Sequence, residues 1–361
     1  MDLYEKIAIL GPGAQYDTCG PRDLGVTTDI PGVYHAKVGG GAECRLFKVL
    51  QTNTCKNNCH YCAFRRDRAC SRAVTTSDEM AKAFMTVLGR RLVDGLFLSS
   101  GITNTPDYTM SRMLDTVTVL RHTYHYRGYI HLKIMPGSSH SSIEYALNMA
   151  NRVSINIEAP TQTDLTSLSP DKNFQKEFLP TLTMLIEAIQ KRKKQGKRAP
   201  SITTQFIVGA GNETDKHLLE ATDRLYKKFG LSRVFYSAFR PVDHTPLSEK
   251  PPASLVRQHR LYQSDFLLRF YRFQLSDFCL SDQGYLNEDV DPKTLWAKRH
   301  PEQFPVNINT ASFYNLIRVP GIGPLSAKKI ISARKECRIT SLDTFTGKRM
   351  QTRKFASYMT T

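Results

Sequence analysis

The sequence has 361 residues, 40% of them hydrophobic, and a formal net charge of +17 at pH 7. This length predicts one large and one small domain, and the hydrophobic content excludes a wholly disordered chain. No run of about 18 uncharged apolar residues occurs, and the start "MDLYEKIAIL" does not have the pattern of a signal peptide. We therefore expect a cytoplasmic protein with no membrane partner.

The positive charge indicates a polyanionic partner. It is unevenly distributed, because residues 311–361 contain ten lysines or arginines and two acids. A second basic run, "KRKKQGKR", covers 191–198, and we interpret it as the solvated end of a helix and the loop after it.

From residue 42 onward, short apolar runs alternate with longer segments of helical period. The runs are rich in Val, Ile, Phe and Tyr, which suits buried strands. We predict strands at 44–50, 95–102, 129–137, 152–160, 202–210 and 233–241. We predict helices at 77–92, 107–124, 141–151, 173–194, 215–229 and 253–274, the first opened by a capping box from Thr76 to Glu79.

Six strand–helix units predict a parallel sheet with right-handed crossovers, either open or curved into a barrel. In both cases the functional groups belong at the carboxyl ends of the strands. We predict an N-terminal extension (1–41), the sheet domain (42–274), a linker (275–305) and a second helical unit (306–361).

A cysteine-rich loop follows the first predicted strand. Cys55, Cys59 and Cys62 have the spacing C-x3-C-x2-C, and in the cytosol such thiols favour a metal or catalysis over disulfides. A structural zinc needs four protein ligands, and Cys44 or Cys70 are candidates for the fourth. A [4Fe–4S] cluster on three cysteines leaves one iron open for a substrate or cofactor, which favours an enzyme.

The stretch "CKNNCHYC" resembles the cysteine loop of the radical S-adenosylmethionine (SAM) enzymes, with Tyr61 as its aromatic residue. The resemblance implies a partial (β/α)6 TIM-like barrel, a [4Fe–4S] cluster held by Cys55, Cys59 and Cys62, and SAM as a second cofactor. It also implies that one electron from the cluster cleaves the SAM sulfonium to give methionine and a 5′-deoxyadenosyl radical. The electron would come from a reductant such as flavodoxin or ferredoxin.

The resemblance implies SAM contacts at the strand ends. The family's second strand usually ends in a Gly-Gly-Glu motif, but here Ser99, Ser100 and Gly101 occupy that place and the glutamate is missing. The fourth strand would meet the ribose through Asn156 and Glu158, which alternate with Ser154 along one face.

The fifth strand partly matches the family's adenine element, with Ile207, Gly209 and Glu213 in place and Gln205 where a glycine is usual. The backbone at Tyr61 would also lie against adenine. Arg240, like Lys133, is a candidate for binding a SAM carboxylate or a substrate phosphate, the alternative being a structural ion pair.

The C-terminal stretch "VNINTASFYNLIRVPGIGPLSAKKIISARK" predicts two short helices around a "PGIGP" turn. We expect Thr310 to cap the first helix, whose apolar stripe comprises Phe313, Leu316, Ile317 and Val319. In the second helix we expect Leu325, Ile330 and Ile331 to face inward, and Lys328 and Lys329 to face outward.

Gly321 and Gly323 allow a tight turn whose amides point out beside a helix N-terminus, which favours an anion. The stretch is similar to the helix-hairpin-helix of DNA repair proteins. We therefore predict binding of duplex DNA through its phosphate backbone, at Gly321, Gly323, Lys328 and Lys329, without sequence preference.

The two resemblances together match the radical SAM proteins named for DNA modification or repair. We predict a radical SAM enzyme acting on DNA. The alternatives are a radical SAM enzyme that modifies RNA, and a non-enzymatic metal-containing DNA-binding protein. Among the other cysteines, Cys19 in "YDTC" is the best candidate for an additional hydrogen donor.

Overall fold

The computed structural model describes residues 1–17, 30–37, 43–341 and 356–361. Cys19 therefore lies outside the described residues. The chain divides into two compact units, the first comprising Met1–Glu213 and Arg224–Ser254 and the second Thr214–Asp223 and Leu255–Thr361.

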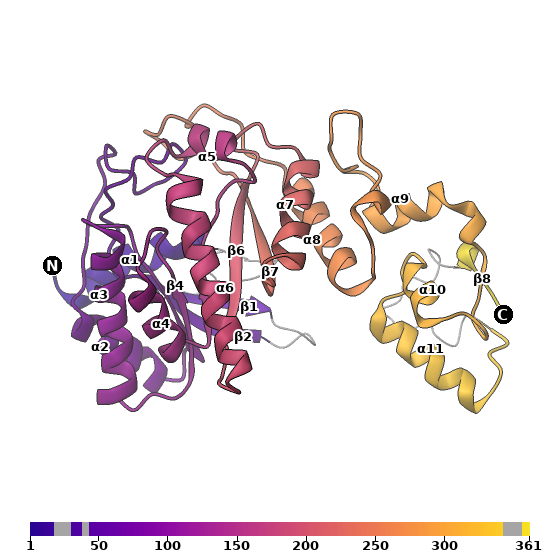
Figure 1. The fold of residues 1–361 in the computed structure, drawn as a ribbon, viewed down its shortest axis with the longest axis horizontal. Helices are drawn as coiled ribbons and strands as arrows, with labels where there is room; N and C mark the ends of the chain where they lie inside the picture. Colours follow the sequence, from indigo (N-terminus) through magenta and orange to yellow (C-terminus); the bar gives the residue numbers. More distant parts are fainter. Residues whose placement is uncertain (18–29, 38–42, 342–355) are drawn as a thin grey trace. The chain divides into compact units, whose positions relative to one another are not determined.

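Unit 1 (Figure 1) is built on one sheet. The sheet has seven strands, which follow one another in chain order. The strands are β1 (Val33–Lys37), β2 (Glu43–Leu50), β3 (Gly95–Ser99), β4 (Tyr129–Lys133), β5 (Arg152–Ser154), β6 (Ser201–Val208) and β7 (Arg233–Ala238). β2 to β7 are parallel and β1 pairs antiparallel with β2. This confirms the predicted partial barrel of six parallel strands, while the edge strand β1 was not predicted.

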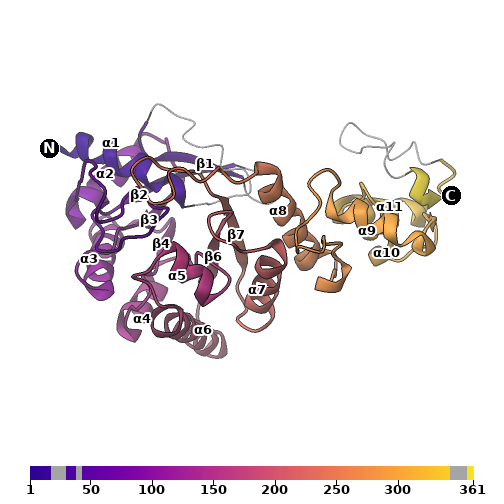
Figure 2. The ribbon, with the colours of Figure 1, turned by 90° about the horizontal axis from the view of Figure 1, so that it is seen from above.

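The predicted helices of unit 1 all form. They are α2 (Ser77–Gly89), α3 (Pro106–Thr118), α4 (His140–Met149), α6 (Leu179–Lys194) and α7 (Asp215–Lys227), and α7 contributes residues to both units. Two further helices, α1 (Leu3–Gly13) and α5 (Gln162–Leu168), were not predicted, and single π-helical turns adjoin α3 and α6 at Val119–Thr123 and Phe174–Phe178. The capping box of Thr76 and Glu79 is present. Figure 2 shows α2, α3, α4 and α6 following one another along one side of the sheet.

The two faces of the sheet differ in chemistry. Residues such as Phe47, Leu98 and Leu132 are fully buried on one face. The alternate positions carry polar groups, among them Lys48, Ser99, His131, Lys133 and Ser154, and we call this the inner face. Because successive strand residues point to opposite faces, the apolar residues form the core and the polar ones line one connected surface.

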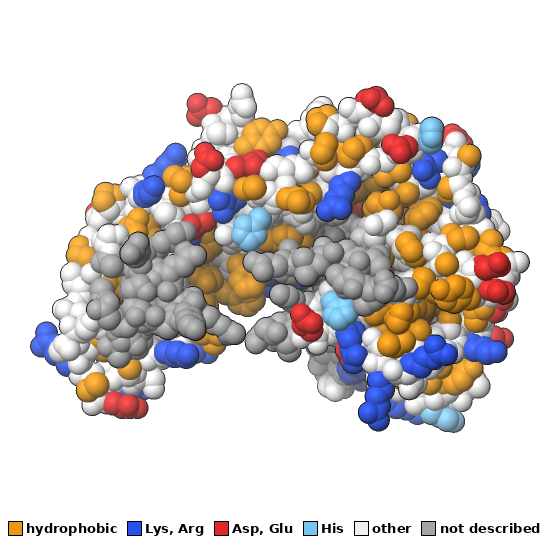
Figure 3. All heavy atoms as spheres, turned by 180° about the vertical axis from the view of Figure 1, so that it is seen from behind, with side chains coloured by type: hydrophobic (Ala, Val, Ile, Leu, Met, Phe, Trp, Pro, Cys, Tyr) orange, Lys and Arg blue, Asp and Glu red, His pale blue; other side chains and the backbone are white. Residues whose placement is uncertain are grey.

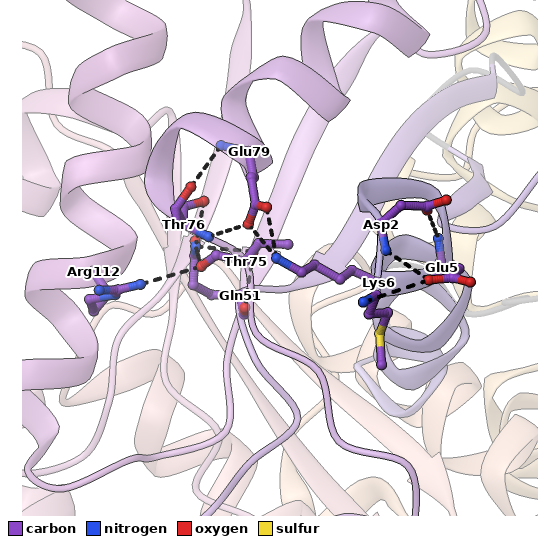
Figure 4. A network of polar contacts seen from close by, with 9 residues as sticks. Asp2, Glu5, Lys6, Gln51, Thr75, Thr76, Glu79 and Arg112 are labelled. Carbon is purple, nitrogen blue, oxygen red and sulfur yellow. Dashed lines mark hydrogen bonds and ion pairs between the residues drawn. The ribbon is translucent and has the colours of Figure 1, made fainter.

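The base of the cysteine loop is closed by hydrogen bonds around Gln51, at the end of β2 (Figure 4). Its amide donates to the carbonyl oxygen of Thr75 at 2.9 Å and accepts from Thr116 at 2.8 Å. Thr52 pairs with Val74 in an isolated bridge, and Lys6 of α1 bonds Glu79 at the start of α2. These contacts therefore hold the two ends of the cysteine loop together.

Unit 2 contains α8 (Leu255–Phe270), α9 (Pro292–Arg299), α10 (Phe313–Arg318), α11 (Pro324–Glu336) and a short parallel pair, β8 (Val306–Asn307) with β9 (Met359–Thr360). The segment predicted as a linker is folded, because it contains α9, and the buried Trp296 of α9 packs on Phe273 at 5.4 Å and on Phe304 at 6.2 Å. The domain boundaries that we derived from the sequence stay a prediction.

Candidate cofactor site and nucleic-acid interface

The cysteine loop is shaped by contacts to its backbone. Arg72 donates to four carbonyl oxygens of the loop, those of Asn53, Phe64, Arg65 and Arg68. A methyl group on Gly101 would lie 2.3 Å from the carbonyl oxygen of Thr54, so only glycine permits this approach. Gly101, which we predicted as a SAM contact, thus packs directly behind Cys55.

The three predicted cluster cysteines lie close enough to influence one another's charge. Burial raises the pKa of Cys62 to about 12, with a further contribution from the charge of Cys59. Burial also raises the pKa of Cys59, which is 6% exposed. Thiolates in such surroundings need compensating positive charge, and a metal supplies it, because a coordinating thiol is deprotonated outright.

The arrangement of the three thiols agrees with an iron–sulfur cluster. Among the described residues, no three His, Cys, Asp or Glu side chains converge where one metal ion could be held. Cys44, a proposed fourth zinc ligand, instead lies in β2 opposite Ala36 of β1. In a cluster each thiolate faces its own iron, so the sulfurs need not converge on one point.

A polar group of three side chains adjoins the cysteines. Burial, and then the charge of the Glu158 carboxylate, raise the pKa of Tyr61 well above its usual value. Lys172 lies 3.6 Å from the same carboxylate. Burial alone would lower the pKa of Lys172, but Cys59 and then Glu158 raise it. The side chain of Tyr61 therefore lies near Glu158.

Glu158 has a left-handed backbone, with φ of 69°, which is uncommon for a residue other than glycine. Its N–H donates to the carbonyl oxygen of Gln205 and its own carbonyl oxygen accepts from Ile207. β6 therefore holds this conformation in place, and such strain concentrates at functional sites.

The inner face of the sheet binds the carboxylate of Asp17, which precedes the cysteine loop in sequence. Lys133 pairs with this carboxylate, the side-chain amide of Asn156 donates to it at 3.3 Å, and Ser99 lies near enough to lower its pKa. Burial would raise the pKa of Asp17, but Lys133 lowers it below its usual value. Lys133 is thus an ion-pair member, and two predicted SAM contacts, Ser99 and Asn156, already converge on one charge.

Three further predicted SAM contacts, Gly209, Ser100 and Arg240, follow the strands β6, β3 and β7. Gly209 follows β6 with φ of 85°, and the buried Glu213 accepts from the N–H groups of Gly209 at 2.5 Å and Gly211 at 3.1 Å. Glu213 therefore closes the loop after β6. Ser100 hydrogen-bonds the carbonyl oxygen of Gly101, and Arg240 is exposed.

Two residues in this site were missed in the sequence. Asp17 lies in the N-terminal extension and Lys172 in the turn after α5. Neither belongs to a motif or a periodic pattern, so only the tertiary structure brings them to the site.

The hairpin of unit 2 agrees with the prediction in outline and differs in two details. The cap of α10 is Ser312, whose hydroxyl accepts from Asn315, so the prediction of Thr310 was wrong. Leu325 is 75% exposed, whereas Ala327 and Ile330 are buried. Leu325 comes five residues before Ile330, which places it on the opposite side of α11, the side of Lys328 and Lys329.

The glycine turn has the predicted form. Gly321 has φ of 85°, and Gly323 precedes α11 with no side-chain cap, which leaves the first amides of α11 without a side-chain acceptor. Lys328 and Lys329 are exposed beside it. Figure 3 shows lysines and arginines at several separate places on the face drawn, so net charge alone does not locate a nucleic-acid surface.

A buried lysine supports the turn from α9. Lys293 is 9% exposed and donates to the carbonyl oxygen of Ile322, between the two glycines, at 2.5 Å. No described carboxylate forms a salt bridge with it. Burial lowers its pKa to about 7, although Asp291 acts in the opposite direction.

Comparison with protein families fits this geometry. Residues 49–225 match the model of the Radical SAM superfamily. The chain therefore contains a radical SAM domain. These enzymes use a [4Fe–4S] cluster and SAM, and the matched range contains the three cysteines, Glu158 and Lys172. Residues 302–346 match the helix-hairpin-helix motif.

Solved radical SAM structures resemble part of the fold. HydG from Carboxydothermus hydrogenoformans, an FeFe-hydrogenase maturase, is 18% identical with a TM-score of 0.46, covering 61% of this chain and 50% of its own. Methylornithine synthase is 16% identical with a TM-score of 0.46, and the match covers 61% of this chain and 60% of the synthase. A radical SAM methyltransferase from Sphaerobacter thermophilus is 16% identical with a TM-score of 0.45, and the match covers 66% of this chain and 71% of the methyltransferase.

The search of curated proteins gave no match. In the part of the chain that the structure describes, every helix is too short or too polar to cross a membrane.

Proposed function

We propose that this radical SAM enzyme acts on DNA, and that Cys55, Cys59 and Cys62 hold its [4Fe–4S] cluster. The observation that carries the DNA proposal is the helix-hairpin-helix motif in the same chain as the radical SAM domain. When bound, the cluster supplies the electron that cleaves SAM. The protein's own groups position the cofactor and exclude side reactions.

In this proposal the Glu158 carboxylate binds the SAM ribose. Its position beside Tyr61 and Lys172 supports this role, because the carboxylate lies near the cysteine loop. Tyr61, Ser99, Ser100, Gly101, Asn156, Ile207, Gly209 and Arg240 complete the proposed SAM surroundings. Gly101 would act through the backbone, because its close approach to Thr54 fixes the cysteine loop.

We propose that the hairpin binds phosphates of duplex DNA. The amides of the Gly321–Gly323 turn and the N-terminus of α11 would receive a phosphate, and Lys328 and Lys329 would add charge. Each neutralised phosphate contributes about −0.9 to the slope of log affinity against log salt concentration. The binding would therefore be salt-sensitive and independent of sequence.

Duplex DNA binding measured over a range of salt concentrations tests this proposal. The double substitution Lys328→Glu and Lys329→Glu should weaken the binding and flatten the salt slope. Lys193→Glu with Lys194→Glu is a matched control, because both lysines are exposed in the other basic run, at the end of α6. An unchanged slope in the hairpin variant would contradict the hairpin proposal, and tighter binding of structured RNA than of duplex DNA would favour the RNA alternative.

A further inference from the structure

The segment Ser167–Lys172, which comprises the end of α5 and the turn after it, packs along the cysteine loop. The N–H of His60 donates to the carbonyl oxygen of Leu168 at 2.8 Å. The imidazole Nδ1 of His60 lies 2.9 Å from the carbonyl oxygen of Ser167. The N–H of Asn58 donates to the Asp171 carboxylate at 2.5 Å. These contacts lie on both sides of Cys59, so the segment fixes the central cysteine.

Two side chains of this segment act on the sulfur of Cys59. The hydroxyl oxygen of Ser169 lies 2.9 Å from Sγ, and Ser169 is fully buried. Lys172 interacts electrostatically with Cys55, Cys59 and Cys62 as well as with Glu158. Its side chain is 12% exposed, so water screens this charge little.

The balance of charge at this site is uneven. Lys172 brings one positive charge, while Glu158 brings one negative charge and the three sulfurs bring more when they are thiolates. A one-electron reduction adds a further negative charge without forming a bond or moving a proton. A fixed cation and a hydroxyl that donates to a ligand sulfur both stabilise the more negative state. Charge and hydrogen bonds to the sulfurs are among the factors that set iron–sulfur potentials.

We propose that Lys172 and Ser169 are positioning residues that raise the reduction potential of the cluster. This inference rests on the proposed function, because it requires a [4Fe–4S] cluster on the three cysteines. Lys172 also connects the cluster site to Glu158, so one side chain would serve both the electron supply and the cofactor contact.

Redox titration of the reconstituted protein without SAM, followed by electron paramagnetic resonance, tests the proposal. Lys172→Met should lower the reduced-to-oxidised ratio at a fixed potential roughly tenfold, which is 59 mV for one electron. Ser169→Ala should also lower this ratio, but by a smaller factor, because only one hydrogen bond to the Cys59 sulfur is lost. Lys172→Arg should stay near the wild-type potential.

Lys176→Met is the matched control. Lys176 is exposed four residues further along, so the substitution makes the same change in net charge away from the cysteines and should leave the potential unchanged. If Lys172→Met takes up little iron, Ser169→Ala decides the test. An unchanged potential in Ser169→Ala, or in a fully loaded Lys172→Met, overturns this inference. A wild-type protein that assembles no cluster would instead overturn the proposed function.

Discussion

Substitution of Lys293 should change how the stability of unit 2 depends on pH. Lys293 is buried in α9 and supports the carbonyl oxygen of Ile322 in the glycine turn. Its pKa is about 7 in the folded protein against 10.5 for the ordinary side chain. The unfolded chain therefore binds more protons between these pH values, so stability rises with pH in that window.

The size of the effect follows from the two pKa values. Between pH 6 and pH 9 the linkage relation gives a gain in the free energy of unfolding of roughly 2 to 3 kcal/mol. Lys293→Met removes the titrating group and should abolish this gain. It also removes the hydrogen bond to Ile322, which should cost about 1 to 3 kcal/mol at every pH.

Trp296 makes the measurement specific to unit 2. It is the single tryptophan of the chain and lies buried in the same helix as Lys293, so its fluorescence reports denaturant unfolding of this unit. Lys298→Met, at an exposed position of α9, is the control with the same change in charge. If Lys293→Met and Lys298→Met gain stability equally between pH 6 and pH 9, the reasoning is wrong.

Three further predictions concern unit 1. Gly101→Ala should lower iron uptake and stability, by about 1 to 3 kcal/mol or more, because its methyl group would strike Thr54. Gly89→Ala should lower neither iron uptake nor stability, because its added methyl group would meet no atom within 4 Å. Equal iron content in the two variants would contradict this prediction. Glu158→Ala should weaken SAM binding about tenfold or more in equilibrium dialysis and leave the iron content unchanged; wild-type affinity would make Glu158 structural. Asp17→Asn should destabilise the protein by about 3 to 5 kcal/mol, since it leaves Lys133 without its charged partner, and denaturant unfolding at wild-type stability would refute this pairing.

The sequence predicted the sheet well, because parallel strands such as β3 and β6 are buried on both faces and read as nearly continuous apolar runs. β5 illustrates the limit of this approach. The apolar run at 152–160 predicted a long strand, but the regular strand ends at Ser154. The chain then bends through the left-handed Glu158, a conformation that no residue pattern indicated.

The candidate site was predicted only where a motif marks it. The cysteine spacing located Cys55, Cys59 and Cys62, and "PGIGP" located the turn. Lys172, Asp17 and Lys293 could not be found in the same way, because each is a single charged residue whose partners are distant in sequence. Leu325 was misplaced because the apolar stripe of α11 is short, and its core positions include the small Ala327.

Reductive cleavage of SAM is the most direct test of the central claim. Anaerobically reconstituted protein with about four irons per chain, mixed with SAM and dithionite, should release 5′-deoxyadenosine, and Cys59→Ala should not. A fully loaded wild-type protein that yields no 5′-deoxyadenosine would contradict the account.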